Sequence, residues 1–147
     1  MTAGTVGERL LLTLWVGTLW AIGFIAVPAV FAHFDDVVIA GEFAGKLFTI
    51  VNYLGLACGT VLSFRYISLG RATQSLWRFW LTLLMLLLVT FLHFYLQAEM
   101  AAIKLLEWRA DSVLSGRFDF LHQASTAVYM VISLLGLALV VSSGRRE

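Results

Sequence analysis

Residues 76–97 read LWRFWLTLLMLLLVTFLHFYLQ, and Arg78 is the one formally charged side chain among them. About 20 apolar residues in a helix are needed to cross the ~30 Å hydrocarbon core of a bilayer. Similar apolar stretches occupy residues 10–32, 47–68 and 120–142. The sequence therefore predicts an all-α fold, in which four helices form an antiparallel integral membrane bundle.

The composition agrees with this prediction and narrows the class of protein. Of 147 residues, 61% are hydrophobic and 13% are charged, which is more apolar than a soluble domain of this length can bury. Four spans use up the whole chain, so a single domain, residues 1–147, is predicted. The net charge of +1 argues against a nucleic-acid partner and leaves the lipid bilayer as the expected surrounding. Phosphate-binding loops, nucleophile elbows and Cys-x-x-Cys pairs are missing from the sequence, which favours a non-enzymatic role without deciding it.

Basic residues predict the orientation, because cytoplasmic loops carry an excess of Lys and Arg. With four spans, both termini share a side with six basic residues, namely Arg9, Arg65, Arg71, Arg78, Arg145 and Arg146. The opposite side carries four, which are Lys46, Lys104, Arg109 and Arg117. Both termini are therefore predicted to be cytoplasmic.

The connection between the third and fourth spans is long and contains no proline. Apolar residues recur there at helical spacing, so the third helix is expected to continue to about residue 115 and to end at Gly116. Asp119 would then cap the fourth helix, and Asp35 or Asp36 would cap the second.

Glycines indicate where helices pack closely, since helices in lipid associate through small residues. Gly41, Gly45, Gly55 and Gly59 share one face of the second helix, and Gly17 lies in the first. We expect this face to pack within the chain, against a second copy, or against another membrane protein.

Polar side chains predict a pocket in the outer half of the bundle. By helical depth, Asn52, His93, Gln97 and His122 could meet there, and Ser125 and Tyr129 share the interior face of the fourth helix with His122. Polar groups at membrane depth are costly unless paired, so they suggest a functional site. They could also serve only to link helices by hydrogen bonds.

Three functions are compatible with this pocket. His93 and His122, with Gln97 and Met100 as further donors, could bind or transport a small cation such as a soft metal, since imidazole and thioether suit copper. The two histidines could instead hold a b-type haem between helices. In the third alternative the chain is a structural or assembly subunit that docks through its glycine face.

Short motifs also suggest a family. They are LWVG at 14–17, PAVF at 28–31, AG at 40–41, AGKLF at 44–48, NYLG at 52–55 and LHQAS at 121–125. The chain resembles a small bacterial membrane family of unknown function, which is similar to an animal transmembrane protein implicated in cisplatin resistance and more distantly to the copper-resistance D membrane proteins. The resemblance implies a bacterial inner-membrane location, and by analogy metal handling or drug export. This chain departs from the family pattern at Ala98–Glu99, where members often carry a proline after the glutamine of the third helix.

Overall fold

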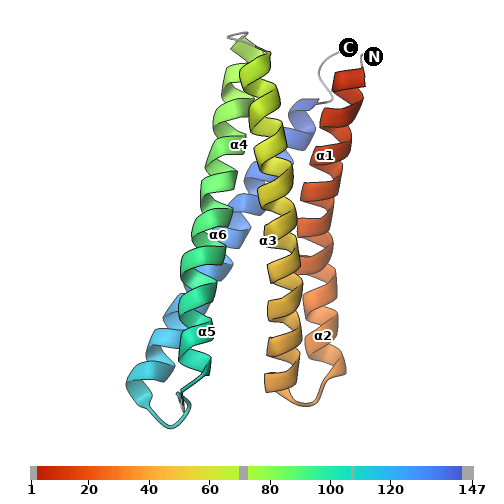
Figure 1. Cartoon of the computed structure of the whole chain (residues 1–147). Helices are drawn as coiled ribbons and strands as arrows, with labels where there is room; N and C mark the ends of the chain where they lie inside the picture. Colours follow the sequence, from red (N-terminus) through yellow and green to blue (C-terminus); the bar gives the residue numbers. More distant parts are fainter. Residues whose placement is uncertain (1–2, 70–72, 107, 144–147) are drawn as a thin grey trace.

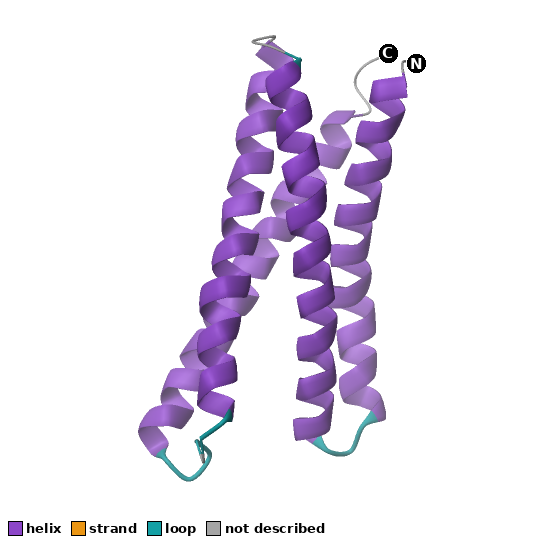
Figure 2. Ribbon diagram, in the orientation of Figure 1, coloured by secondary structure: helices purple, strands orange, loops and turns teal. Residues whose placement is uncertain are grey.

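The computed structural model describes residues 3–69, 73–106 and 108–143, and these form helices and short turns with no strand (Figure 2). The sequence predictions that involve Arg71, Arg145 and Arg146 lie outside the described residues. The elements in chain order are α1 (Ala3–Trp20), η1 (Ala21–Ala26), α2 (Val27–His33), α3 (Val37–Ser68), α4 (Thr73–Phe91), η2 (Leu92–Gln97), α5 (Ala98–Lys104) and α6 (Ser112–Ser143).

These elements combine into four long helical rods that run antiparallel (Figure 1). The first rod consists of α1, η1 and α2, the second of α3, the third of α4, η2 and α5, and the fourth of α6. Four helical stretches are long and apolar enough to cross a membrane, and they cover Gly4–His33, Val37–Ser68, Leu76–Lys104 and Ser112–Ser142. At 1.5 Å per residue, a 30-residue rod is about 45 Å long, which exceeds the hydrocarbon thickness. The predicted four-helix membrane bundle is confirmed.

The start of α1 and the end of α6 lie at one end of the bundle, which we call the terminal end (Figure 1). The opposite end, which we call the distal end, holds the turn at residues 34–36 and the connection at 105–111. At the distal end, α5 and α6 lie apart from α2 and α3 in Figure 1, whereas α3 lies beside α4 toward the terminal end.

One predicted helix cap is confirmed. The carboxylate of Asp36 accepts a hydrogen bond of 2.7 Å from the backbone N–H of Val38, and Asp36 precedes α3 as its N-cap. This bond satisfies one of the amide groups that a helix start leaves unpaired.

The connection between the third and fourth rods differs from the prediction. The third rod ends at Lys104 rather than near residue 115, and α6 already begins at Ser112. Asp111 caps α6, because its carboxylate accepts from the N–H groups of residues 113 and 114 at 2.8 and 3.3 Å. Gly116 and Asp119 lie inside α6. An earlier capping aspartate therefore starts the helix, and Gly116 is simply tolerated within it.

Two rods contain a short π-helical segment toward the distal half. In the first rod, η1 ends two residues before Pro28, whose ring nitrogen carries no N–H for the helix ladder. In the third rod, η2 follows α4 and carries His93 and Gln97. A π-turn adds a residue, so positions beyond it are rotated relative to an uninterrupted α-helix.

Trp15 occupies the centre of the core and explains two of the predicted packing glycines. A Cβ added to Gly55 would lie 2.6 Å from the Trp15 Nε1, and one added to Gly59 would lie 3.0 Å from the same ring. The absence of side chains at these positions lets α3 approach α1. By contrast, a Cβ on Gly17, Gly41 or Gly45 would meet no atom within 4 Å. The close contact expected of those three glycines is not made within the described chain.

Candidate functional site: a cleft at the distal end

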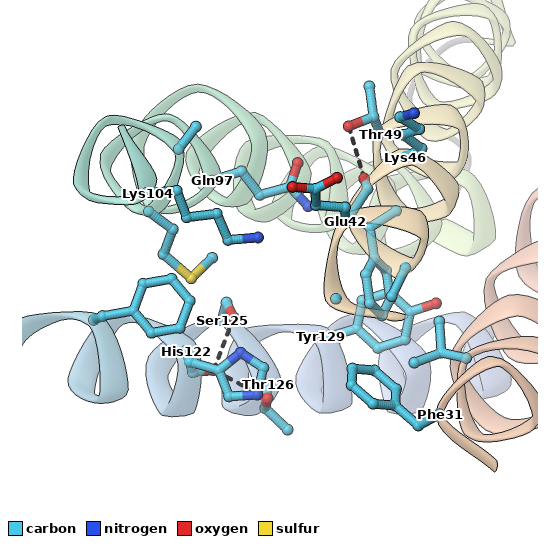
Figure 3. A pocket seen from close by; sticks show the side chains of 18 of the residues that line it. Phe31, Glu42, Lys46, Thr49, Gln97, Lys104, His122, Ser125, Thr126 and Tyr129 are labelled. Carbon is cyan, nitrogen blue, oxygen red and sulfur yellow. Dashed lines mark hydrogen bonds between the residues drawn. The ribbon is translucent and has the colours of Figure 1, made fainter. Parts of the chain in front are cut away.

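The distal end contains a cleft of about 870 Å³, which we call the distal cleft. It lies between the first and second rods on one side and the third and fourth on the other, and Figure 3 shows part of its lining. Ligand sites in proteins are commonly concave, largely apolar and about 300–1,000 Å³ in volume. The distal cleft therefore has the size of a small-molecule site.

Apolar side chains form most of its walls. The first rod contributes Phe24, Val27 and Phe31, and the second contributes Val37 and Val38. Many of these side chains are exposed to the surroundings of the isolated chain. In a membrane they would face either lipid or a bound apolar molecule.

The deepest lining residues of the four rods form a floor. They are Gly23 on the first rod, Phe48 and Thr49 on the second, Leu92 on the third, and Tyr129 and Met130 on the fourth. Tyr129 is only 8% exposed, and its hydroxyl donates a hydrogen bond to the backbone carbonyl of Leu19. Its ring lies where a Cβ on Gly23 would be, and the Phe48 ring meets it edge-on at 5.1 Å between centroids. Tyr129 is thus held by contacts from two other rods.

Cations and aromatic rings form the rim of the distal cleft. The Lys104 ammonium lies 5.9 Å from the centre of the Phe118 ring, and the Arg109 guanidinium lies 4.5 Å from that of Trp108. Trp108 and Phe118 are stacked at 4.4 Å, and Phe118 is stacked on His122 at 6.3 Å. Cation–π contacts hold both basic groups at the distal mouth.

The described lining carries an excess of positive charge. Lys46, Lys104 and Arg109 are basic, and Glu42 is the acidic residue among the lining positions that the structure describes. With histidine neutral, these residues give a formal charge of +2. In Figure 3, Lys104 and Gln97 reach into the cleft from the third rod, and Glu42 reaches in from α3.

Five of the predicted site residues line the distal cleft, and they are Gln97, Met100, His122, Ser125 and Tyr129. The Ser125 hydroxyl donates to the carbonyl of His122 at 2.8 Å, and the Thr126 hydroxyl donates to the same carbonyl at 3.0 Å. The serine hydroxyl hydrogen is therefore used within its own helix, which leaves the oxygen as an acceptor.

His93 and Asn52 do not belong to this lining. His93 packs edge-on against Tyr53 at 4.7 Å, and its Nδ1 lies 3.2 Å from the Gln97 Oε1. Because His93 and Gln97 both lie in η2, uniform α-helical spacing does not describe their relative directions. Asn52 lies one turn deeper than Phe48, is 2% exposed, and its Nδ2 has no hydrogen-bond partner in the described part of the chain. The pocket predicted from sequence thus differs from the distal cleft at these two positions.

The positions of the side chains that could act as ligands bear on the metal site predicted from sequence. Within residues 3–69, 73–106 and 108–143, no group of three or more His, Cys, Asp or Glu side chains is placed to hold a metal ion. His122, Gln97 and Met100 share the cleft, but one imidazole, one amide and one thioether make a sparse ligand set.

A buried ion cluster at the terminal end was missed by the sequence analysis. Glu8 is 3% exposed, and its Oε1 accepts from the Arg78 Nη2 at 2.7 Å and from the Tyr66 hydroxyl at 2.9 Å. Its Oε2 lies 3.3 Å from the Arg65 Nε. Arg78, 2% exposed, also donates to the Ser142 hydroxyl at 3.0 Å. We call these five residues the Glu8 cluster, and they connect all four rods.

Sequence signals for the Glu8 cluster existed. Arg78 is the single charged residue of its apolar stretch, and Glu8 is an acidic residue on the side that carries most arginines. A charge so placed in a membrane span calls for a partner of opposite sign.

Comparisons with known proteins give one match. Residues 10–108 match a family model described as a domain of unknown function, DUF4149. Neither the search of curated proteins nor the search of solved structures gave a significant match.

Proposed function

The chain belongs to the DUF4149 family, which is described as a domain of unknown function, and from this premise we propose that its distal cleft binds an anionic single-chain amphiphile, such as a fatty acid, from the membrane. The observation that carries the proposal is the pairing of apolar walls with a basic rim in one cleft of about 870 Å³. A fatty acid has the matching distribution, with an apolar chain and one negative group at its end.

The dimensions of the cleft support an acyl chain. On α3 the lining runs from Val37 to Thr49, which is about 18 Å at 1.5 Å per residue. Half of a ~30 Å hydrocarbon core is about 15 Å, the depth of one leaflet. An acyl chain bound in the cleft would therefore extend over the same depth that it occupies in one leaflet of the bilayer.

Charge supports an anionic head group. A basic residue near a membrane surface contributes about 1 kcal/mol to the binding of an anion. Lys104 and Arg109 hold their charges at the distal mouth, whereas Glu42 enters from α3. The excess of positive charge favours a carboxylate or phosphate over a cation.

Soft-metal binding, which the resemblance to copper-resistance proteins implies, is a second candidate for the same cleft. It is favoured by the presence of His122, Gln97 and Met100 in one lining. The basic rim and the sparse ligand set count against it. A haem held by His93 and His122 has less support, because His93 packs on Tyr53 outside the lining. Docking of a partner through Gly41 and Gly45 would need the same space that we assign to the amphiphile.

Photo-cross-linking tests the proposal. The protein is reconstituted in phosphatidylcholine vesicles with a palmitate analogue that carries a diazirine, and adducts are quantified by mass spectrometry. We expect saturable labelling that is competed by palmitate and not by hexadecanol. In the Lys104→Gln/Arg109→Gln variant, the palmitate concentration for half-competition should rise roughly 5-fold per charge removed.

Arg117→Gln is the matched control, because Arg117 is a distal-end arginine outside the cleft lining and paired with Glu99. It should compete like the wild type. Labelling that palmitate does not compete would overturn the proposal, as would equal competition by hexadecanol or by added phospholipid. Saturable copper(I) binding that is lost in His122→Ala would favour the metal candidate instead.

A further inference from the structure

We propose that the amphiphile enters the distal cleft tail first and that Tyr129 and Phe48 set the longest chain that it accepts. This inference rests on the proposed function and deepens it, because it assigns the residues that determine specificity. It starts from the floor, where the deepest lining residues of the four rods meet.

The orientation follows from the two ends of the cleft. The basic groups of Lys104 and Arg109 lie at the distal mouth over aromatic rings. The opposite end presents the apolar side chains of Phe48, Leu92, Tyr129 and Met130. It also presents Thr49, whose hydroxyl donates to the carbonyl of Gly45 within its own helix. An anionic head belongs at the mouth and an apolar tail at the floor, since each then meets groups of its own kind.

Tyr129 is built as a rigid stop rather than as a movable side chain. Its hydroxyl is bonded to the carbonyl of Leu19, its ring fills the space left by Gly23, and the Phe48 ring packs edge-on against it at 5.1 Å between centroids. Moving the ring would break that hydrogen bond and leave a buried carbonyl with one partner fewer, which is costly. A tail that reaches Tyr129 therefore meets a fixed surface.

The region below the floor is unsuited to a longer tail. Asn52 lies one helical turn beyond Phe48 on α3 and is 2% exposed, and its Nδ2 lacks a partner within the described residues. Methylene groups that passed the floor would bring no hydrogen-bond acceptor to this amide. Trp15, whose ring lies against Gly55, and Val51 belong to the buried core.

The distance from mouth to floor sets the expected length. From Lys104 to Leu92 the third rod spans about 18 Å by α-helical rise, and from Phe118 to Tyr129 α6 spans about 16 Å. Both values are close to the depth of one leaflet, about 15 Å. Chains as long as those of ordinary membrane lipids should fit, and longer ones should lose affinity.

The test has two readouts that do not depend on the same variant. In the wild type, a palmitate analogue with the diazirine at its tail end should label Phe48, Leu92 or Tyr129. An analogue with the diazirine next to the carboxylate should label residues of the rim, such as Trp108 or Phe118. The reverse pattern, or tail-end labelling confined to the rim, would overturn the inference.

The second readout is chain-length preference, measured by competition with laurate, palmitate and arachidate. Tyr129→Leu and Phe48→Ala should raise the affinity for arachidate relative to palmitate, by about fourfold for each methylene newly accommodated. Tyr129→Phe keeps the ring between Gly23 and Phe48 but loses the bond to Leu19, so it should change the preference less than Tyr129→Leu does. Phe94→Ala removes a 61% exposed ring that lies outside the lining, so it should leave the ratio of arachidate to palmitate affinity as in the wild type.

The outcomes separate the two proposals. If palmitate competes in the wild type but neither floor variant changes the arachidate-to-palmitate ratio, the floor assignment is wrong and the binding proposal stands. If no fatty acid competes in the wild type, the binding proposal itself fails. If a floor variant does not fold, the labelling of the wild type decides the assignment.

Discussion

Glu8 is a single residue that contacts side chains from two other rods at the terminal end. Its two carboxylate oxygens accept from Arg65, Tyr66 and Arg78, and Arg78 extends the network to Ser142 on α6. Removing one partner of a buried ion pair leaves the other charge uncompensated in a medium that solvates it poorly. The cost therefore lies mainly in Arg78, which is 2% exposed.

We expect Glu8→Gln to destabilise the protein by about 3 kcal/mol, because it removes the carboxylate charge that pairs with the buried Arg78 guanidinium at 2.7 Å. The measurement is SDS-induced unfolding in mixed micelles, followed by tryptophan fluorescence. The matched control is Glu99→Gln, whose ion pair with Arg117 has side chains 37% and 58% exposed and should contribute less than about 1 kcal/mol. Equal destabilisation by the two substitutions would show that the Glu8 cluster does not hold the terminal end together.

For single residues, the sequence predicted those that stand out chemically and missed those whose role depends on the direction in which the side chain points. His122, Gln97 and Met100 were found because polar or soft side chains in an apolar stretch are conspicuous. Lys104 and Arg109 were assigned only to the side opposite the termini, since sequence spacing does not reveal that they face a cleft. His93 was placed by regular spacing that η2 interrupts.

Among whole elements, α3 changes its role along its length. Its central glycines, Gly55 and Gly59, lie against Trp15, whereas Gly41 and Gly45 line the distal cleft with open space above them. The repeated spacing of the glycines predicted one continuous packing face. It could not show where the neighbouring rods stop following α3, because that depends on how the rods diverge at the distal end.

A pair of glycine substitutions should separate these roles. Gly55→Ala places a Cβ 2.6 Å from the Trp15 indole and should destabilise the fold by roughly 1–3 kcal/mol through overpacking. Gly41→Ala meets no atom within 4 Å and should be neutral or stabilise by up to about 1 kcal/mol, because alanine favours the helix more than glycine. Both values come from the same SDS titration. Destabilisation by Gly41→Ala as large as that by Gly55→Ala would indicate a tight contact at Gly41 with another chain.

The start of α6 provides a second prediction for an element. Asp111→Ala removes the acceptor for the first amides of α6 and should cost about 1 kcal/mol. Asp119→Ala, at the position that sequence analysis took for the cap, should change stability by less than about 0.5 kcal/mol, since an exposed surface position seldom contributes more. Thermal unfolding in detergent compares the two variants, and a larger loss for Asp119→Ala would contradict the assigned boundary.

In the whole molecule the four rods are joined by polar contacts at the terminal end and enclose a cleft at the distal end. Hydrogen bonds and ion pairs of the Glu8 cluster join the four rods at the terminal end. At the distal end the rods enclose a cleft, and both η1 and η2 contribute to its lining through Gly23, Phe24, Leu92 and Gln97. Apolar length fixed the number and direction of the rods in advance. The joined end and the open end arise from contacts between residues far apart in sequence. The local pattern signals that Arg78 needs an acidic partner, but it does not encode which rods meet there.

The orientation of the whole molecule decides which leaflet can supply a ligand to the distal cleft. Six basic residues against four predict that the terminal end is cytoplasmic, although Arg65 and Arg78 are committed to Glu8. In a Cys58→Ala background, which removes the natural thiol, we expect a membrane-impermeant maleimide to label Ala110→Cys in intact cells, since residue 110 is exposed at the distal end. Ser68→Cys, exposed at the terminal end, should react only after the membrane is permeabilised. The opposite labelling would place the mouth of the distal cleft on the cytoplasmic side, and the ligand would then come from the inner leaflet.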